Sequence, residues 1–192
     1  MARIALFGGS FNPPHKGHLD VMLWLQRERA ALGLDEVWIL PTVNHAFGKE
    51  LLPFEVRQDL ILGILGTEFM ARPIHRVVRR EETYTADLLE NLQRERPGDV
   101  FRPVLGADIL HERHKWHRWE DILRLSDPIF VSRVGYTPPD GFQVHQVNAA
   151  DPSSTDIRTR LAKGDPCFDV LPPVVAVRIR RARLYQNPHS GT

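Results

Sequence analysis

The chain has 192 residues, of which 42% are hydrophobic and 26% are charged, a composition typical of one globular domain. Its formal net charge of +1 gives no overall electrostatic basis for binding nucleic acid or an anionic membrane. The single cysteine, Cys167, excludes an intrachain disulfide and is typical of a reducing compartment. There is no signal-peptide profile and no apolar run long enough to span a bilayer, so we expect a cytoplasmic protein.

Apolar runs bounded by turn residues alternate along the chain with segments of helical periodicity. We expect strands over residues 4–7, 36–40, 74–78, 100–105, 129–132 and 142–147, the last of them at an edge. We expect helices that begin near residues 17, 155 and 173, and helices over residues 54–69, 84–95 and 119–125. This order predicts the α/β class, with a single Rossmann-like parallel sheet covered by helices on both faces. Residues 1–186 would form one domain and residues 187–192 a flexible tail.

The first predicted helix carries an apolar series at Leu19, Met22, Leu23 and Ala30. Positions three and four residues apart share one side of a helix. We therefore expect these side chains to form its buried face.

The most informative stretch follows the first strand and reads Gly8-Gly9-Ser10-Phe11-Asn12-Pro13-Pro14-His15-Lys16-Gly17-His18. Paired glycines allow close approach of backbone N–H groups to a ligand, and the start of a helix favours anions. His15 and His18 are three residues apart at that start and can face the same point. The arrangement suits a polyphosphate. The chain lacks both a Gly-x-Gly-x-x-Gly after a strand and a Gly-x-x-x-x-Gly-Lys-Ser/Thr, so two familiar phosphate loops are excluded.

A second motif reads Asp151-Pro152-Ser153-Ser154-Thr155-Asp156-Ile157-Arg158. Ser153 and Asp156 have the spacing of a capping box at a helix start. Hydroxyl groups, free backbone amides and the Arg158 guanidinium would form a second anion cradle there. Taken alone, the segment would be an ordinary well-capped helix.

Further polar residues follow other predicted strands, at 44–49 and in Gly106-Ala107-Asp108. Ligands of parallel α/β sheets bind beyond the carboxyl ends of the strands. We therefore expect one active site at this edge of the sheet.

Residues 8–18 resemble the signature of the nucleotidyltransferase superfamily that carries a His-x-Gly-His motif. Residues 152–158 are similar to its second motif, Ile-Ser-Ser-Thr-x-Ile-Arg, with Pro152 in place of the isoleucine. Nearly the whole chain resembles the nicotinate (or nicotinamide) mononucleotide adenylyltransferases of that superfamily. The segments that carry this resemblance are Thr83-Tyr84-Thr85-Ala86-Asp87, Val104-Leu105-Gly106-Ala107-Asp108, Trp116, Trp119-Glu120-Asp121-Ile122-Leu123, Leu171-Pro172-Pro173-Val174 and Leu184-Tyr185.

Two positions depart from that family. The segment Asn44-His45-Ala46-Phe47-Gly48-Lys49 stands where Pro-Pro-His-Lys is usual, and Leu88 stands where the Tyr-Thr motif usually ends in threonine. We expect Lys49 to take over the phosphate-binding role of the family's lysine.

The resemblance implies an ATP-dependent enzyme that joins AMP to nicotinate mononucleotide, forming deamido-NAD and pyrophosphate in NAD biosynthesis. It implies Mg²⁺ as the metal that accompanies ATP, with no metal site of the protein's own. The implied catalytic residues are His15, His18, Lys49 and Arg158. The implied ATP-binding residues are Gly8, Gly9, Ser10, Phe11, Gly106, Asp108, Ser153, Ser154 and Thr155. The implied mononucleotide-binding residues are Tyr84, Thr85, Asp108 and Trp116.

We expect the nicotinate form to be preferred over the nicotinamide form. A carboxylate can accept several backbone N–H bonds near Tyr84 and Thr85, whereas an amide presents its own donors to them. For Trp116, stacking on the pyridine ring and simple packing in the core both remain open.

Two other functions are compatible with the first motif. The chain could be another adenylyl- or cytidylyltransferase of the superfamily, of the pantetheine-phosphate type, but residues 83–87 and the paired tryptophans argue against it. It could also be a regulatory nucleotide-binding module without catalysis, against which His15, His18 and Arg158 together argue. Three further histidines, at 111, 114 and 117, have a spacing that would spread them around a helix and lack the zinc-binding pattern His-Glu-x-x-His.

Overall fold

The computed structural model describes residues 1–43, 51–69, 74–132, 137–139, 141–149 and 152–186. Its strands are β1 (Arg3–Gly9), β2 (Glu36–Pro41), β3 (His75–Val77), β4 (Val100–Gly106), β5 (Ile129–Ser132) and β6 (Val144–Gln146). Its helices are α1 (Lys16–Glu28), α2 (Phe54–Glu68), α3 (Thr85–Glu95), α4 (Ile109–Glu112), η1 (Arg113–Lys115), α5 (Trp119–Leu125), α6 (Ser154–Ala162) and α7 (Pro173–Arg181). Apart from α4 and the short 3₁₀ helix η1, these elements are the ones that the sequence predicts.

The six strands form one sheet in the order β3-β2-β1-β4-β5-β6, and every described pairing is parallel. The strand order reverses between β1 and β4, which are direct neighbours. The predicted α/β class and parallel sheet are confirmed, as is the edge position of the last strand. This reversal places the ends of β1 and β4 where parallel α/β proteins bind ligands.

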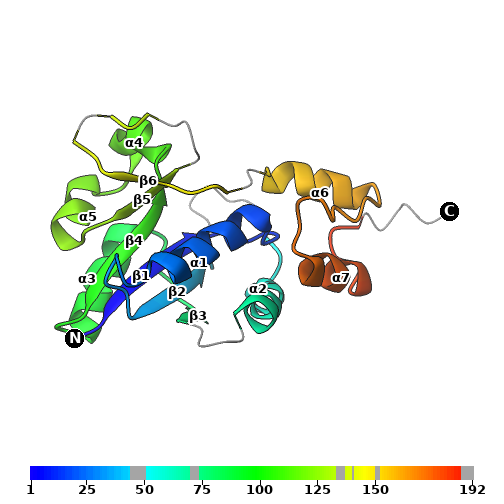
Figure 1. Ribbon diagram of the computed structural model, residues 1–192, viewed down its shortest axis with the longest axis horizontal. Coiled ribbons are helices and arrows are strands. Elements are labelled where there is room, and N and C mark those ends of the chain that lie inside the picture. Colours follow the sequence, from blue (N-terminus) through cyan, green and yellow to red (C-terminus); the bar gives the residue numbers. More distant parts are fainter. Residues whose placement is uncertain (44–50, 70–73, 133–136, 140, 150–151, 187–192) are drawn as a thin grey trace.

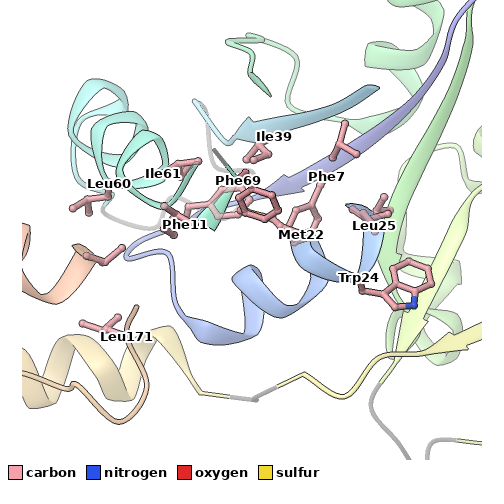
Figure 2. Close-up of a cluster of buried hydrophobic side chains, with 14 of the residues drawn as sticks. Phe7, Phe11, Met22, Trp24, Leu25, Ile39, Leu60, Ile61, Phe69 and Leu171 are labelled. Carbon is pink, nitrogen blue, oxygen red and sulfur yellow. The ribbon is translucent and has the colours of Figure 1, made fainter. Parts of the chain in front are cut away.

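Alternate residues of each strand enter different cores, because successive side chains of a strand point to opposite faces. In β1, Ala5 and Phe7 join one core, and Ile4 and Leu6 join the other. The first core includes buried side chains of α1, α2, α6 and α7, several of which Figure 2 shows. The second includes side chains of α3, α4 and α5. Figure 1 shows α6 and α7 together on the side of the molecule away from α3 and α5.

The buried face of α1 differs from the predicted one. Met22 is buried as expected, but Leu23 and Ala30 are exposed, and α1 ends at Glu28. Trp24 and Leu25 are buried instead. The predicted core position of Leu23 is wrong because the buried face of α1 is centred on Met22 and Leu25 and extends to Trp24, whose ring lies 5.2 Å from that of His145 on β6.

In the part of the chain that the structure describes, no helix is both long and apolar enough to cross a membrane.

Candidate active site

Residues 8–14, which comprise the last two residues of β1 and the turn after it, are called the glycine loop below. A Cβ added at Gly8 would meet no atom within 4 Å, whereas one added at Gly9 would lie 3.3 Å from the ring of Phe11. Phe11 is fully buried, packs edge-on against Phe7 and has a positive φ of 46°. A non-glycine residue holds that conformation only where its surroundings fix it. The loop is therefore a defined structure with open space beside Gly8.

His15 and His18 lie together at the start of α1, as predicted. Their ring centroids are 3.7 Å apart, and the ring of Phe11 lies 4.6 Å from that of His18. Lys16, which separates the two positions, is turned elsewhere: its Nζ donates to the carbonyl oxygens of Phe168 and Asp169. The imidazoles are thus the side chains that the first turn of α1 presents beside the glycine loop.

The protonation of His18 follows from its contacts. The backbone N–H of His15 donates to Nδ1 of His18 over 3.1 Å, so the proton of the neutral ring is on Nε2. Burial, followed by the nearby charge of His15, lowers the pKa of His18 well below its usual value. At neutral pH His18 is therefore an uncharged ring with one N–H donor in a fixed orientation.

A buried arginine holds the glycine loop through hydrogen bonds to main-chain carbonyl oxygens. Arg57 of α2 is 2% exposed, and its guanidinium donates to the carbonyl oxygens of Ser10 (2.7 Å), Thr42 (2.7 Å) and Leu52 (2.8 Å). Arg57 is not among the site residues predicted from the sequence. Its signal was present, because an arginine at the spacing of the buried residues Phe54 and Ile61 falls on the apolar face of α2.

The second motif meets the glycine loop at Arg158. Its Nη1 donates to the carbonyl oxygen of Asn12 (3.0 Å) and its Nη2 to the hydroxyl of Thr155 (3.2 Å). Ser153 is the N-cap of α6, and its side chain accepts from the backbone N–H of Asp156 at 3.3 Å. The two motifs, separated by more than a hundred residues, therefore share one site at the start of two helices.

The end of β4 contributes Gly106 and Asp108. A Cβ added at Gly106 would lie 2.5 Å from Oδ1 of Asp108, so the carboxylate folds back over the bare glycine backbone. Asp108 is exposed and is not among the described residues that line the pocket considered next.

Tyr84, Thr85 and Trp116 come together, as predicted, around a pocket of about 310 Å³. The described residues that line it are Thr83, Tyr84, Thr85, Glu112, Lys115, Trp116 and His117. Trp116 is half-buried and packs edge-on against Trp119, with ring centroids 6.1 Å apart. One part of the indole packs against the core and another faces the pocket, so core packing is confirmed and stacking on a pyridine ring stays a prediction.

The three histidines at 111, 114 and 117 do not lie on one helix, contrary to the sequence expectation. α4 ends at Glu112, η1 ends at Lys115, and the backbone is extended at Trp116. His117 therefore turns to the pocket, where its ring lies 4.4 Å from that of Tyr84. His117 is a pocket residue that the sequence pattern does not predict, because the pattern places the three histidines around one helix.

Among the described residues, no three His, Cys, Asp or Glu side chains are gathered as a metal-binding group. Asp108 is the carboxylate at the end of β4, and Mg²⁺ commonly binds through one or two carboxylates together with substrate phosphates. The donor set suits a Mg²⁺ ion that arrives with a polyphosphate. Lys49 and the rest of the atypical segment lie outside the described residues.

Comparison with known proteins identifies relatives of this chain. The family model described as cytidylyltransferase-like matches residues 6–160. The chain is 37% identical over 188 residues to a probable nicotinate-nucleotide adenylyltransferase of Anaeromyxobacter sp. (strain K), covering 96% of this chain and 97% of that protein. It is 33% identical to the probable nicotinate-nucleotide adenylyltransferase of Bacillus pumilus (strain SAFR-032), covering 97% and 100%.

Among solved structures, the fold is similar to that of the Plasmodium falciparum nicotinic acid mononucleotide adenylyltransferase complexed with NaAD. The TM-score is 0.81 at 19% sequence identity, and the match covers 96% of this chain and 98% of that one. At this identity the likeness concerns the fold.

Proposed function

Since the chain belongs to the cytidylyltransferase-like family and, within it, to the nicotinate-nucleotide adenylyltransferases, we propose that it transfers the adenylyl group of ATP to nicotinate mononucleotide. The products are deamido-NAD and pyrophosphate. The single observation that carries the proposal is the hydrogen bond from Arg158 to the carbonyl of Asn12, which joins the two anion-binding motifs into one site.

The reaction forms one bond and breaks one. A phosphate oxygen of the mononucleotide attacks the α-phosphorus of ATP in line, and the bond from that phosphorus to the oxygen shared with the β-phosphate breaks. The pyrophosphate leaves with the electron pair of that bond. The attacking phosphate is already an anion at neutral pH, so the site needs to position the groups and stabilise charge rather than remove a proton.

In this proposal the Nε2–H of His18 donates to an α-phosphate oxygen, where negative charge develops. The neutral ring and its fixed tautomer support that role, because the donor needs no rearrangement during the reaction. The ring of His15 packs against the ring of His18. Gly8 leaves room for the triphosphate beside the backbone, whereas the absence of a Cβ at Gly9 makes room for the ring of Phe11.

Arg158 and the start of α6 would hold the β- and γ-phosphates that leave as pyrophosphate. Lys49 is proposed to bind the same phosphates on the strength of the sequence alone. Mg²⁺ bound to the triphosphate would neutralise part of its charge, with Asp108 as the carboxylate at the end of β4.

The pocket at the start of α3 is proposed to take the pyridine ring. Trp116 offers an indole face, and the first turn of α3 at Thr85 offers backbone N–H groups. Donors of this kind suit the carboxylate of nicotinate.

The test is pyrophosphate release from ATP and Mg²⁺ with nicotinate mononucleotide and nicotinamide mononucleotide in separate reactions, with the dinucleotide product identified by mass. We expect kcat/KM for the nicotinate form to exceed that for the nicotinamide form by at least tenfold. A ratio near one would refute the acceptor assignment. Absence of pyrophosphate release with either would refute the proposed function.

A further inference from the structure

Asn12 is the point at which three distant segments meet the glycine loop. It is 2% exposed. Its Oδ1 accepts from the backbone N–H of Leu52 (3.3 Å) and from the hydroxyl of Tyr185 (2.8 Å), and its carbonyl oxygen accepts from Arg158 (3.0 Å). The contacts come from the segment before α2, from the segment after α7 and from α6. Anything that shifts Asn12 therefore also shifts the acceptor that orients Arg158.

Tyr185 reaches Asn12 through a shaped turn after α7. The backbone N–H of Leu184 donates to the carbonyl of Ile179 (3.0 Å), and both Arg183 and Tyr185 have positive φ values, of 51° and 62°. A positive φ at a non-glycine residue costs conformational free energy, and the contacts of the turn must offset that cost. The hydrogen bond to Asn12, across 173 positions of sequence, is such a contact.

The phenol is a donor at neutral pH. Burial raises the pKa of Tyr185, and the nearby guanidinium groups of Arg158 and Arg57 oppose this shift. The hydroxyl keeps its proton, and Oδ1 of Asn12 is the acceptor of the pair.

The glycine loop is thereby fixed at two places. Arg57 holds the carbonyl of Ser10, and Tyr185 holds the side chain of Asn12. His15 and His18 follow this stretch directly. A buried loop held by neighbouring hydrogen bonds keeps groups that act on substrate within the narrow geometry that positioning requires.

We propose that Tyr185 is a positioning residue for adenylyl transfer, whose hydroxyl holds Asn12 so that the glycine loop and Arg158 meet the triphosphate in register. Tyr185 is therefore part of the ATP half of the site and acts through Asn12 and Arg158. This inference rests on the proposed function.

The decisive variant is Tyr185→Phe, which removes one oxygen atom and keeps the ring. The net value of one buried hydrogen bond corresponds to a change of roughly fivefold to tenfold. We expect kcat/KM for ATP to fall by about that factor, while KM for the mononucleotide stays within about twofold, because the pyridine pocket is built from α3 and the segment around Trp116.

Ile179→Val is the matched control. Ile179 is buried in α7, and its loss of one methylene weakens the packing of the same C-terminal region without removing the hydrogen bond to Asn12. We expect this variant to lower the thermal midpoint and to leave kcat/KM for ATP unchanged. If both variants change ATP kinetics equally, or if Tyr185→Phe lowers only the thermal midpoint, the hydroxyl has a purely structural role and the proposal is wrong.

A binding measurement distinguishes failure of this proposal from failure of the proposed function. The dissociation constant of a non-hydrolysable ATP analogue with Mg²⁺ is measured by calorimetry for the wild type and both variants. Weaker binding by Tyr185→Phe alone supports the positioning role even if the wild type proves inactive with both mononucleotides. Equal binding by all three proteins overturns it.

Discussion

The replacement of His18 by alanine tests the chemical core of the site. His18 occupies the third position of α1, its Nδ1 accepts from the backbone of His15, and its ring lies 3.7 Å from that of His15 and 4.6 Å from that of Phe11. The substitution therefore removes two things at once, the donor that is proposed to meet the triphosphate and a hydrogen-bonded ring at the helix start.

The two losses have different sizes and different readouts. Loss of a preorganised donor to developing charge costs about 3 kcal/mol of transition-state stabilisation, or about a hundredfold in kcat. Loss of the hydrogen bond at the start of α1 costs about 1 kcal/mol of folding free energy. We expect His18→Ala to be folded, with a lower thermal midpoint and a kcat reduced at least a hundredfold.

The assay is steady-state pyrophosphate release beside thermal unfolding, with His145→Ala as the control. His145 lies on β6 with its ring 5.2 Å from that of Trp24, so this variant also removes a packed imidazole while leaving the glycine loop intact. Near-normal turnover of a folded His18→Ala protein would refute the role of His18. An equal loss of turnover in both variants would attribute the effect to packing.

Arg158→Ala should raise KM for ATP and lower kcat together, by at least tenfold in kcat/KM, because the guanidinium contacts charge in the ground state and the transition state; unchanged ATP kinetics with reduced thermal stability would favour a merely capped helix. Gly106→Ala should displace the carboxylate of Asp108, which lies 2.5 Å from the added Cβ, and reduce kcat about tenfold, whereas Gly66→Ala, whose Cβ meets no atom within 4 Å, should leave turnover unchanged. Burial lowers the pKa of His75 to about 4, so the unfolded chain binds a proton there first as pH falls, and stability is lost between about pH 6.5 and pH 4. Chemical denaturation at pH 7 and at pH 5 should show that the free energy of unfolding falls by about 2 kcal/mol less in His75→Leu than in the wild type. Equal falls in the two proteins would contradict a lowered pKa of His75.

The sequence predicted the sheet because its strands are short apolar runs that end at glycine, proline or polar residues. β1 and β4, for example, end in Gly8-Gly9 and Gly106, and those endings also marked the ligand edge. The two histidines were predictable as a pair because helix geometry alone brings positions three residues apart together. Local rules of this kind need no knowledge of the rest of the fold.

The parts that the sequence did not predict depend on contacts between distant segments. Tyr185 was noted only within a family-like ending, because no spacing rule connects it to Asn12. The helix predicted to carry His117 is wrong because η1 ends at Lys115 and the backbone is extended at Trp116, which packs against Trp119; a local pattern does not contain that contact. Leu23 was assigned to the core because the helical spacing defines a face but not which edge of that face the sheet covers.

The same contrast explains how the site is built. The groups proposed to touch substrate, such as His18 and Arg158, stand within the first two turns of helices, where local sequence fixes them. The groups that hold those turns in register, Arg57 and Tyr185, come from elsewhere and bind main-chain or amide oxygens of the glycine loop. A substrate-binding group can be exchanged with a local effect, whereas a change in the supporting groups moves several substrate-binding groups at once. For that reason, effects of Tyr185→Phe and Arg158→Ala on ATP kinetics should not be additive, since Tyr185 is proposed to act in part by holding Asn12, the residue that orients Arg158.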